Sequence, residues 1–415
     1  MSEPRKIKRH GVSSRQNIVV RDPGPAVEIT IASLAAGGDG VGRDATGRVT
    51  FIPRTAPGDV VRARITQATS SFARAELVEV VTPSPDRVEP PCPHFQRGCG
   101  GCQWQHVSRT AQLAAKQAIV AGALRKLEGL NVHPIADPAP ELHWRRRARF
   151  HVVGGKVGLY QLDSHRVLDI DHCPQLEDKL DTALGQVAAS SPPDGELALV
   201  VGHRGDVAIG VGRPWRGAER LVGRAAIRGV TADRQTVGDP VIEIEPGLWG
   251  GPWMFAQASA AGNAALIARV RDVVGKGTGK LLELYAGSGN FTRSFIADGW
   301  KVLATDGVAP DRPIGFEYRV GPVAEVLSAL EGPFEVIILD PPRAGAAEAI
   351  DGIVRLAPQT IVYISCDPAT LARDAGKLAA AGYGATDAWP FDLMPQTSHL
   401  EVVMRFVRAD GVPTA

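Results

Sequence analysis

The sequence has no apolar run long enough to cross a membrane, because such a helix needs about 18 to 20 predominantly apolar residues. The basic opening after Met1 is also not followed by the apolar stretch of a secretory signal peptide. Apolar residues make up 44% and charged residues 22%, which is typical of a globular protein and not of a disordered or fibrous one. We therefore expect a cytoplasmic protein without a membrane partner.

An excess of charge of either sign is missing too, since the formal net charge is +1. No overall field then marks a nucleic-acid partner, so local clusters of Arg and Lys must carry any such interpretation. Residues 1–16 hold five basic side chains against Glu3 alone, which predicts a basic flexible tail over 1–25. A second cluster predicts contacts with nucleic-acid phosphates, with a solvated strand edge as the alternative, and its members are Arg145, Arg146, Arg147 and Arg149.

Cysteine is scarce, and five residues are an odd set that disfavours a disulfide framework in a reducing compartment. Metal binding and nucleophilic catalysis are the leading remaining uses. Cys92, Cys99 and Cys102 follow a Cys-x6-Cys-x2-Cys pattern, and Cys173 stands far along the chain. Four thiolates suit an iron–sulfur cluster or tetrahedral zinc, and the spacing does not choose between them. The Cys-x3-Cys-x2-Cys pattern of radical S-adenosylmethionine enzymes is absent, which favours a structural cluster over a redox centre.

Changes in the apolar pattern divide the rest of the chain into three parts. Residues 26–84 show short alternating apolar runs between Gly-rich turns, which predict a small β-barrel. Residues 85–250 follow a Pro-rich break and carry four cysteines, an amphipathic helix near 110–128 and short strands. Residues 251–415 contain apolar runs at 281–285, 301–305, 334–339 and 361–365 between helical stretches. This alternation indicates an α/β, Rossmann-like domain with a parallel sheet.

The segment Glu283–Asn290 predicts a cofactor loop, because it follows the first of these strands and precedes a helix. Gly287 and Gly289 allow a tight turn close to a ligand, and Asp306 ends the next strand, where an acid can bind ribose hydroxyls. The third glycine of the dinucleotide motif is missing, so pyrophosphate binding lacks support. The arrangement favours S-adenosylmethionine over NAD.

Two polar segments end the next two strands. Asp340–Arg343 and Ser365–Pro368 should lie at the sheet edge where α/β proteins bind ligands. Cys366 could have a purely structural role as a small buried hydrophobic residue, but its position before an Asp-Pro turn favours a nucleophile. A thiolate that adds to C6 of a pyrimidine makes C5 able to attack a sulfonium methyl group. Such a reaction also needs a base that removes the C5 proton.

At these residues the sequence resembles the RNA 5-methyluridine methyltransferase family, whose signatures match Asp340–Arg343, Ser365–Pro368 and the closing segment Phe391–Glu401. The resemblance implies that Cys366 is the nucleophile and Glu401 the base. It implies pyrimidine and cofactor contacts for Phe255 and Gln257, and it assigns a cofactor shell to Tyr285, Asn290, Asp306 and Asp340. It also implies a [4Fe-4S] cluster on Cys92, Cys99, Cys102 and Cys173.

The sequence departs from the family pattern at two places. Ser259 stands where the family usually has Asn, and Asn263 is too far along to be taken as equivalent. A polar residue expected near the adenine falls at Gly321–Pro322, and the stretch between Asp306 and Val326 is short and Pro-rich for the usual helix. Both departures bear on how tightly the cofactor binds.

The predicted barrel resembles a TRAM domain, and the resemblance implies an OB-like RNA-binding module. Within the family this module accompanies the enzymes for 23S ribosomal RNA more often than the enzyme for transfer RNA. The resemblance therefore implies ribosomal RNA as the partner, with a uridine of the transfer RNA T-loop as the alternative. The target is expected to be a loop nucleotide swung into the pocket of a monomeric enzyme. A different class, an iron–sulfur RNA-binding protein without activity, is disfavoured because Cys366, Glu401 and Asp340 are all present.

Overall fold

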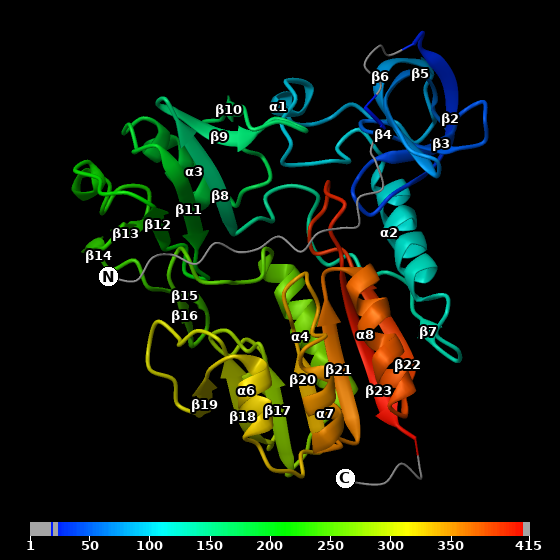
Figure 1. Ribbon diagram of the computed structural model, residues 1–415. Coiled ribbons are helices and arrows are strands. Elements are labelled where there is room, and N and C mark those ends of the chain that lie inside the picture. Colours follow the sequence, from blue (N-terminus) through cyan, green and yellow to red (C-terminus); the bar gives the residue numbers. More distant parts are fainter. Residues whose placement is uncertain (1–17, 20–23, 410–415) are drawn as a thin grey trace. The chain divides into compact units, whose positions relative to one another are not determined.

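The structure is a computed structural model that describes residues 18–19 and 24–409 (Figure 1). The basic cluster in residues 1–16 lies outside the described residues. The chain divides into two compact units, Met1–Glu89 with His106–Ala111 and Pro90–Gln105 with Gln112–Ala415. Within the described ranges, no helix has both the length and the apolar character that a bilayer span requires.

The first unit is a closed six-stranded barrel, as the sequence predicts. Its strands follow the order β1-β5-β2-β3-β4-β6, and a further pairing of β5 with β6 closes the sheet. Buried residues alternate with exposed ones, so Ile29 and Ile31 point into the core between exposed neighbours. The strands are β1 (Ile18–Val19), β2 (Val27–Leu34), β3 (Gly40–Arg43), β4 (Val49–Ile52), β5 (Val60–Ala68) and β6 (Phe72–Thr82).

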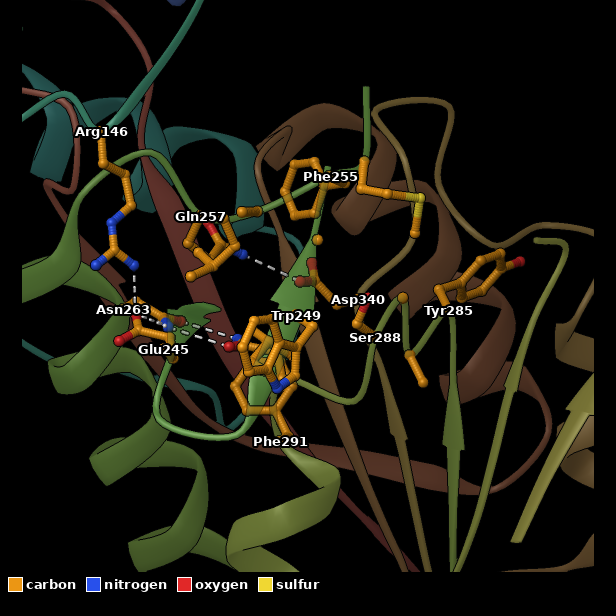
Figure 2. A pocket seen from close by; sticks show the side chains of 18 of the residues that line it. Arg146, Glu245, Trp249, Phe255, Gln257, Asn263, Tyr285, Ser288, Phe291 and Asp340 are labelled. Atoms are coloured by element: carbon orange, nitrogen blue, oxygen red, sulfur yellow. Dashed lines mark hydrogen bonds and ion pairs between the residues drawn. The ribbon is translucent and has the colours of Figure 1, made fainter. Parts of the chain in front are cut away.

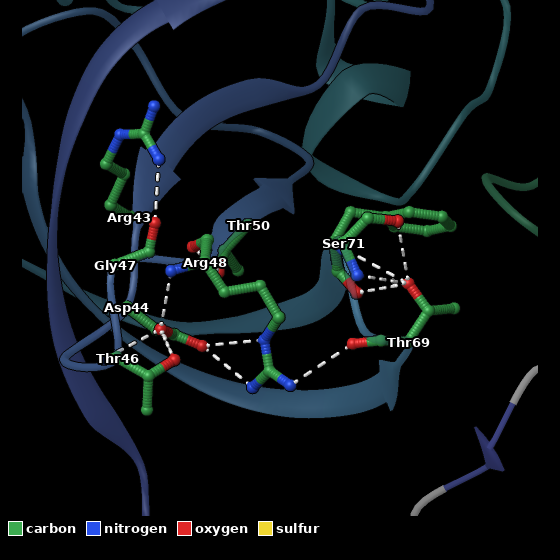
Figure 3. A network of polar contacts seen from close by, with 9 residues as sticks. Arg43, Asp44, Thr46, Gly47, Arg48, Thr50, Thr69 and Ser71 are labelled. Carbon is green, nitrogen blue, oxygen red and sulfur yellow. Dashed lines mark hydrogen bonds and ion pairs between the residues drawn. The ribbon is translucent and has the colours of Figure 1, made fainter.

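A buried aspartate organises the hairpin between β3 and β4 (Figure 3). Asp44 Oδ1 accepts hydrogen bonds from the backbone N–H of Thr46 at 2.9 Å and of Arg48 at 3.1 Å, and Oδ2 binds the Arg48 guanidinium. Burial by itself raises the pKa of Asp44, but the hydrogen bonds from Thr46 and Arg48 outweigh it and hold the pKa at about 2. Local polar contacts therefore fix this hairpin.

A second buried aspartate joins the barrel to the segment that follows it. Asp59 accepts hydrogen bonds from the backbone N–H of Ala56 at 2.7 Å and of Ser84 at 2.8 Å, and it pairs with Arg87. The segment around Arg87 forms backbone hydrogen bonds with residues 106–108. These contacts explain why residues 106–111 belong to the first unit.

The second unit contains a seven-stranded sheet of order β10-β9-β8-β11-β12-β13-β14, in which β12 and β13 are parallel and the other pairs antiparallel. Helix α3 (Asp178–Ala188) contributes Leu180 and Leu184 to the core that also holds Phe150 and Ile209 from the sheet. The strands are β8 (Arg147–Val153), β9 (Lys156–Tyr160), β10 (Val167–Asp169), β11 (Gly195–Val201), β12 (Val207–Val211), β13 (Ile227–Ala232) and β14 (Gln235–Gly238).

The other large sheet of this unit has eight strands in the order β19-β18-β17-β20-β21-β23-β22-β7. The strands from β19 to β21 are parallel, and β23 runs antiparallel to β21. This arrangement confirms the predicted α/β domain. The strands are β7 (Asn131–Val132), β17 (Lys280–Leu284), β18 (Lys301–Asp306), β19 (Glu317–Val320), β20 (Val336–Leu339), β21 (Thr360–Ser365), β22 (Tyr383–Phe391) and β23 (Glu401–Arg408).

Helices cover both faces of this sheet. Neighbouring residues of β20 point into different cores: Ile337 packs with residues of α6, α7 and α8, and Ile338 packs with residues of α4 and α5. Burial on both faces is why the strands read as continuous apolar runs. The helices are α4 (Ala260–Val274), α5 (Thr292–Ala297), α6 (Val323–Ser328), α7 (Ile350–Leu356) and α8 (Pro368–Ala380).

Shorter elements complete the chain. The predicted amphipathic helix is α2 (Arg109–Leu124), which ends a few residues earlier than expected. The short stretch after Asp306 holds only β19 and the six-residue α6. The remaining elements are α1 (Pro93–Gln96), the 3-10 helix η1 (Ala218–Arg220) and a hairpin of β15 (Ile242–Glu245) and β16 (Leu248–Gly250).

Candidate active site

A pocket with about 600 Å³ of empty space, including its open mouth, lies at the carboxyl ends of β17 and β20 (Figure 2). This is the edge at which open α/β sheets bind ligands. Seven residues that the sequence predicts for cofactor or substrate line it: Arg146, Phe255, Gln257, Tyr285, Gly287, Asn290 and Asp340.

The glycine loop after β17 is held in shape by Asp306. Its Oδ2 accepts a hydrogen bond from the backbone N–H of Gly287 at 2.9 Å, and Tyr318 donates from its hydroxyl to the Gly287 carbonyl at 2.7 Å. Gly289 has a φ of 86°, and a Cβ there would meet the Phe316 ring at 2.5 Å. Gly289 and Asp306 therefore shape the loop, while Gly287 lines the pocket.

An amide pair on the pocket wall was not expected from the sequence. Asn263 of α4 and Asn290 of the glycine loop exchange two hydrogen bonds, at 3.0 and 2.8 Å. Asn263 also donates to Glu245 at 2.9 Å, and Glu245 pairs with Arg146 (Figure 2). Ser259, by contrast, caps α4 by accepting from the Gly262 N–H at 3.1 Å. Asn263 thus reaches the cofactor loop from one helical turn beyond Ser259.

Strand pairing brings the candidate nucleophile Cys366, the candidate base Glu401 and the cofactor-shell residue Asp340 to one sheet edge. Cys366 follows the last residue of β21, and Glu401 opens β23, whose Val402 pairs with Ser365. Asp340 follows β20, the parallel neighbour of β21, and accepts a hydrogen bond from Gln257 at 3.2 Å. Residues from three distant parts of the sequence thus meet beside the pocket.

Burial raises the pKa values of all three groups, and neighbouring carboxylates raise those of Cys366 and Glu401 further. Burial and the Glu401 charge raise the pKa of Cys366 to about 11, while the Arg343 guanidinium acts in the opposite direction. Burial raises the pKa of Asp340 to about 7, and burial with the Asp340 charge raises that of Glu401 well above its usual range. Glu401 Oε2 is buried and has no hydrogen-bond partner among the described residues. The group is therefore suited to holding and passing a proton.

Sequence reasoning did not single out Arg343 as a site residue, although it lies within one of the quoted motifs. Its guanidinium donates to the His399 ring at 2.9 Å and lowers the pKa of Cys366. Burial and the Arg343 charge lower the pKa of His399 to about 4, so this ring is neutral at neutral pH. Glu283 was also missed as a site residue. It lines the pocket, accepts a hydrogen bond from Thr292, and has a pKa raised by burial to about 8.

The four predicted phosphate-binding arginines face different surroundings. Arg145 lies over the Trp144 ring at 4.7 Å and lines a second pocket, and Arg146 is buried against Glu245. Arg147 and Arg149 belong to β8 and lie over the rings of Phe255 at 5.2 Å and Trp253 at 5.5 Å.

All four remaining cysteines line that second pocket, which has about 500 Å³ of empty space. Burial raises the pKa of Cys102 to about 11 and of Cys173 to about 12, and the Arg145 charge opposes both shifts. Among the described residues, no group of three or more His, Cys, Asp or Glu side chains is placed to hold a metal ion. The thiols therefore share one cavity but do not converge on a single point.

The segment before Glu401 is fastened to the cysteine-bearing segment. The backbone N–H groups of Gln103 and Trp104 donate to the Gln396 carbonyl at 3.2 and 3.0 Å. Gln103 Oε1 accepts from the Ser398 N–H at 3.3 Å. Lys116 of α2 forms a fully buried ion pair with Asp392 at 2.6 Å.

The fold and the pocket define the class of Rossmann-like methyltransferases. The chain superimposes with a TM-score of 0.71 on Pyrococcus abyssi tRNA (uracil-54, C5)-methyltransferase in complex with S-adenosyl-L-homocysteine, at 21% identity and over 92% of this chain and 99% of the other. This likeness concerns the fold.

Family comparisons narrow the class. A TRAM domain model matches residues 21–78, and a model described as tRNA (Uracil-5-)-methyltransferase matches 328–408. The chain is 31% identical to the 23S rRNA (uracil(1939)-C(5))-methyltransferase RlmD of Pectobacterium atrosepticum, over 97% of this chain and 99% of the relative. The RlmD of Alkalilimnicola ehrlichii is 32% identical over 94% and 98%. The chain belongs to the S-adenosylmethionine-dependent RNA uracil-C5 methyltransferase family.

Proposed function

We propose that this enzyme methylates C5 of a uridine in RNA through a covalent adduct between Cys366 and uracil C6. The observation that carries the proposal is the placement of Cys366, Asp340 and Glu401 at one sheet edge beside a pocket with a glycine loop. S-adenosylmethionine supplies the methyl group on its sulfonium. Its nucleoside part fits the loop of Gly287, Gly289 and Asn290, with Tyr285, Asp306, Gln257 and Asp340 around it.

The reaction uses the side chains in a fixed order. Cys366 Sγ, as the thiolate, bonds to uracil C6 and leaves the ring with an electron-rich C5. C5 takes the methyl group as the methyl–sulfonium bond breaks. The Glu401 carboxylate then removes the C5 proton, and the returning electron pair breaks the Sγ–C6 bond. Arg343 lowers the pKa of Cys366 and so favours the thiolate both when it attacks C6 in the first step and when it leaves C6 in the last step.

We propose that Cys92, Cys99, Cys102 and Cys173 hold a [4Fe-4S] cluster with a structural role. The four thiols line one pocket, which fits a four-thiolate ligand set. Tetrahedral zinc on the same four thiolates is the alternative occupant. Arg145 at the same pocket would offset part of the negative charge of a thiolate-bound cluster.

Ribosomal RNA is the proposed substrate. The relatives named for 23S rRNA match nearly the whole chain at 31–32% identity, and the barrel belongs to the TRAM family. Transfer RNA is the second candidate, because the 21% identical structural neighbour is named for it. We further propose a monomeric cytoplasmic enzyme organised as a tail (1–25), an RNA-binding barrel (26–84), a cluster region (85–250) and a catalytic domain (251–415). Strand β1 (Ile18–Val19) falls within the tail of this division but pairs with β5, so these two residues belong to the barrel.

Methyl transfer from labelled S-adenosylmethionine tests the proposal directly. The wild-type chain is expected to label 23S rRNA fragments in preference to transfer RNA, with the label at C5 of a uridine by mass spectrometry. Cys366→Ala is expected to abolish labelling with an unchanged melting temperature, because a methyl side chain cannot form the adduct. Labelling by this variant at the wild-type rate would refute the covalent mechanism, and exclusive labelling of transfer RNA would refute the substrate.

A further inference from the structure

The face of β8 that points away from the α3 core carries a row of cationic and aromatic pairs. Ala148, Phe150 and Val152 are buried in the core, so the alternate residues Arg147, Arg149 and His151 lie on the opposite face. Each of these three residues is paired with an aromatic ring. The rings belong to Phe255 at 5.2 Å, Trp253 at 5.5 Å and Tyr160 at 3.9 Å, in the order of the strand.

Small residues on the neighbouring strands make room for the middle ring. Arg149 pairs in register with Ala198 of β11, which pairs with Gly210 of β12. A Cβ on Gly210 would come within 2.6 Å of the Trp253 indole, so the ring lies directly on this glycine. Trp253 is nevertheless half-buried rather than covered. The sheet therefore holds the indole in a fixed position with part of its surface open.

The row is continuous with the candidate active site. Phe255 lines the pocket (Figure 2) and is 66% exposed. Trp253 stands two residues before it in the sequence. Alternate residues of a strand lie about 6.6 Å apart, so the row presents its side chains at a regular spacing along one face. Burial is the main reason that the pKa of Arg147 is lowered to about 10, and the charges of the neighbouring Arg149 and Arg145 add to the shift. Glu196 approaches Arg149 only at 3.8 Å with both side chains about half exposed, so it offsets little of that charge.

We propose that single-stranded RNA next to the target uridine runs along this β8 face, with phosphates on Arg147 and Arg149 and bases stacked on Trp253 and Tyr160. The inference rests on the proposed RNA substrate and adds the path that the strand takes. Stacking platforms require unpaired bases, whereas a duplex hides its base faces and offers only shape and phosphates. An acidic protein segment would use the arginines but would not require the ring of Trp253.

Binding of a fluorescein-labelled twelve-nucleotide oligouridylate, followed by fluorescence anisotropy without S-adenosylmethionine, tests the path. Trp253→Ala is expected to weaken binding about tenfold or more, which is the usual loss for one stacked base. Trp253→Phe keeps a ring and is expected to stay within about threefold of wild type. Arg149→Ala is expected to reduce the slope of log affinity against log salt by about one, because one phosphate contact is lost.

Arg269 provides a matched control, because its guanidinium lies over the Trp389 ring at 5.3 Å in another part of the second unit. Arg269→Ala is expected to bind the oligouridylate as wild type does. Melting temperatures of all variants separate lost contacts from lost folding. Wild-type affinity of folded Trp253→Ala for the oligouridylate would overturn the proposal. Equal affinity of the wild-type protein for a twelve-base-pair RNA duplex would also overturn it. A third contrary result would be that polyglutamate displaces the oligouridylate equally well from the wild-type protein and from Trp253→Ala. The assay needs no methyl transfer, so failure of the proposed reaction and failure of this path are distinguishable.

Discussion

Two regions of the second unit hold buried or half-buried thiols beside an arginine, yet the other neighbours of these thiols differ. In the cysteine pocket, Cys102 and Cys173 face other thiols, and Arg145 opposes the rise in pKa that burial causes. At the sheet edge, Cys366 faces Glu401 and Asp340, and Arg343 plays the opposing part. The four thiols of the cysteine pocket line one cavity and suit a ligand set. A thiol beside carboxyl groups has partners for proton transfer. The neighbours of a thiol, rather than its burial, therefore distinguish a metal-binding site from a catalytic site.

The largest effect on turnover is expected from a substitution of Glu401. Glu401→Gln removes the proton acceptor but keeps the shape, so turnover is expected to fall by about 10²- to 10⁴-fold. The methylated RNA is expected to stay bonded to Cys366, because the Sγ–C6 bond breaks only after the C5 proton leaves. Gel electrophoresis under denaturing conditions after incubation with labelled S-adenosylmethionine measures the adduct.

The double variant Cys366→Ala with Glu401→Gln is the control, and it is expected to give no adduct. Turnover retained in Glu401→Gln, with no denaturation-resistant complex, would assign the base to another residue.

A substitution in the cysteine pocket is expected to change the iron and sulfide content of the protein more directly than its methyl-transfer activity. Cys102→Ser removes one thiolate from the proposed ligand set, so iron and sulfide per chain are expected to fall severalfold in anaerobically purified protein. The visible absorption of the cluster is expected to fall in parallel, while Cys366→Ser keeps both at the wild-type level. Stoichiometric zinc without iron in the wild-type protein would replace the cluster with a zinc site and leave the methyltransferase chemistry untouched.

The comparison also shows what the sequence could reveal. Strand ends were predictable, because apolar runs followed by polar residues placed Asp340 and Cys366 at one edge of a parallel sheet. The limits of β8 were predictable from its alternation, and the same alternation puts Arg147 and Arg149 on one face. Arg145 and Arg146 precede the strand, so no periodicity showed that they turn to the cysteine pocket and to Glu245.

Residues that depend on tertiary packing were not predictable. Asn263 stands one helical turn from the position where the family pattern places an asparagine, and only the packing of α4 brings it to Asn290. The link from Gln103 to the segment before Glu401 joins residues almost 300 positions apart, and no local pattern encodes it. Both the site and its support therefore depend on contacts between distant segments.

A smaller effect is expected from the arginines. Arg343→Ala removes a charge that lowers the pKa of Cys366, so this pKa is expected to rise further above about 11. The thiolate fraction at a fixed pH below the pKa then falls, and alkylation of Cys366 by iodoacetamide is expected to slow about three- to tenfold at pH 8. Mass spectrometry of the Cys366 peptide across a pH series measures the rate.

Arg343→Lys, which keeps the charge, is expected to restore most of the rate, and Arg145→Ala is expected to leave it unchanged. Faster alkylation in Arg343→Ala would show that this arginine shields the thiol sterically rather than favouring its charged form.

The smallest effect on turnover is expected at Gln103, which links the cysteine-bearing segment to the segment before Glu401. Gln103→Ala removes the acceptor for the Ser398 N–H and also the Nε2 donor to the Gly100 carbonyl at 3.1 Å, but it leaves the four cysteines in place, so iron content is expected to stay close to the wild-type level. Loss of the hydrogen bond to Ser398, with a net worth of about 0.5–1.5 kcal/mol, lets the segment before Glu401 shift, which corresponds to a turnover about two- to tenfold lower. The Michaelis constant for RNA is expected to change little, because Gln103 positions the base rather than the substrate. Single-turnover rates with saturating RNA measure the effect, and Gln103→Glu, which keeps an acceptor oxygen, is expected to recover part of it. A rise in the Michaelis constant with unchanged turnover would instead place Gln103 in the RNA-binding surface. The cysteine-bearing segment would then have no part in positioning Glu401.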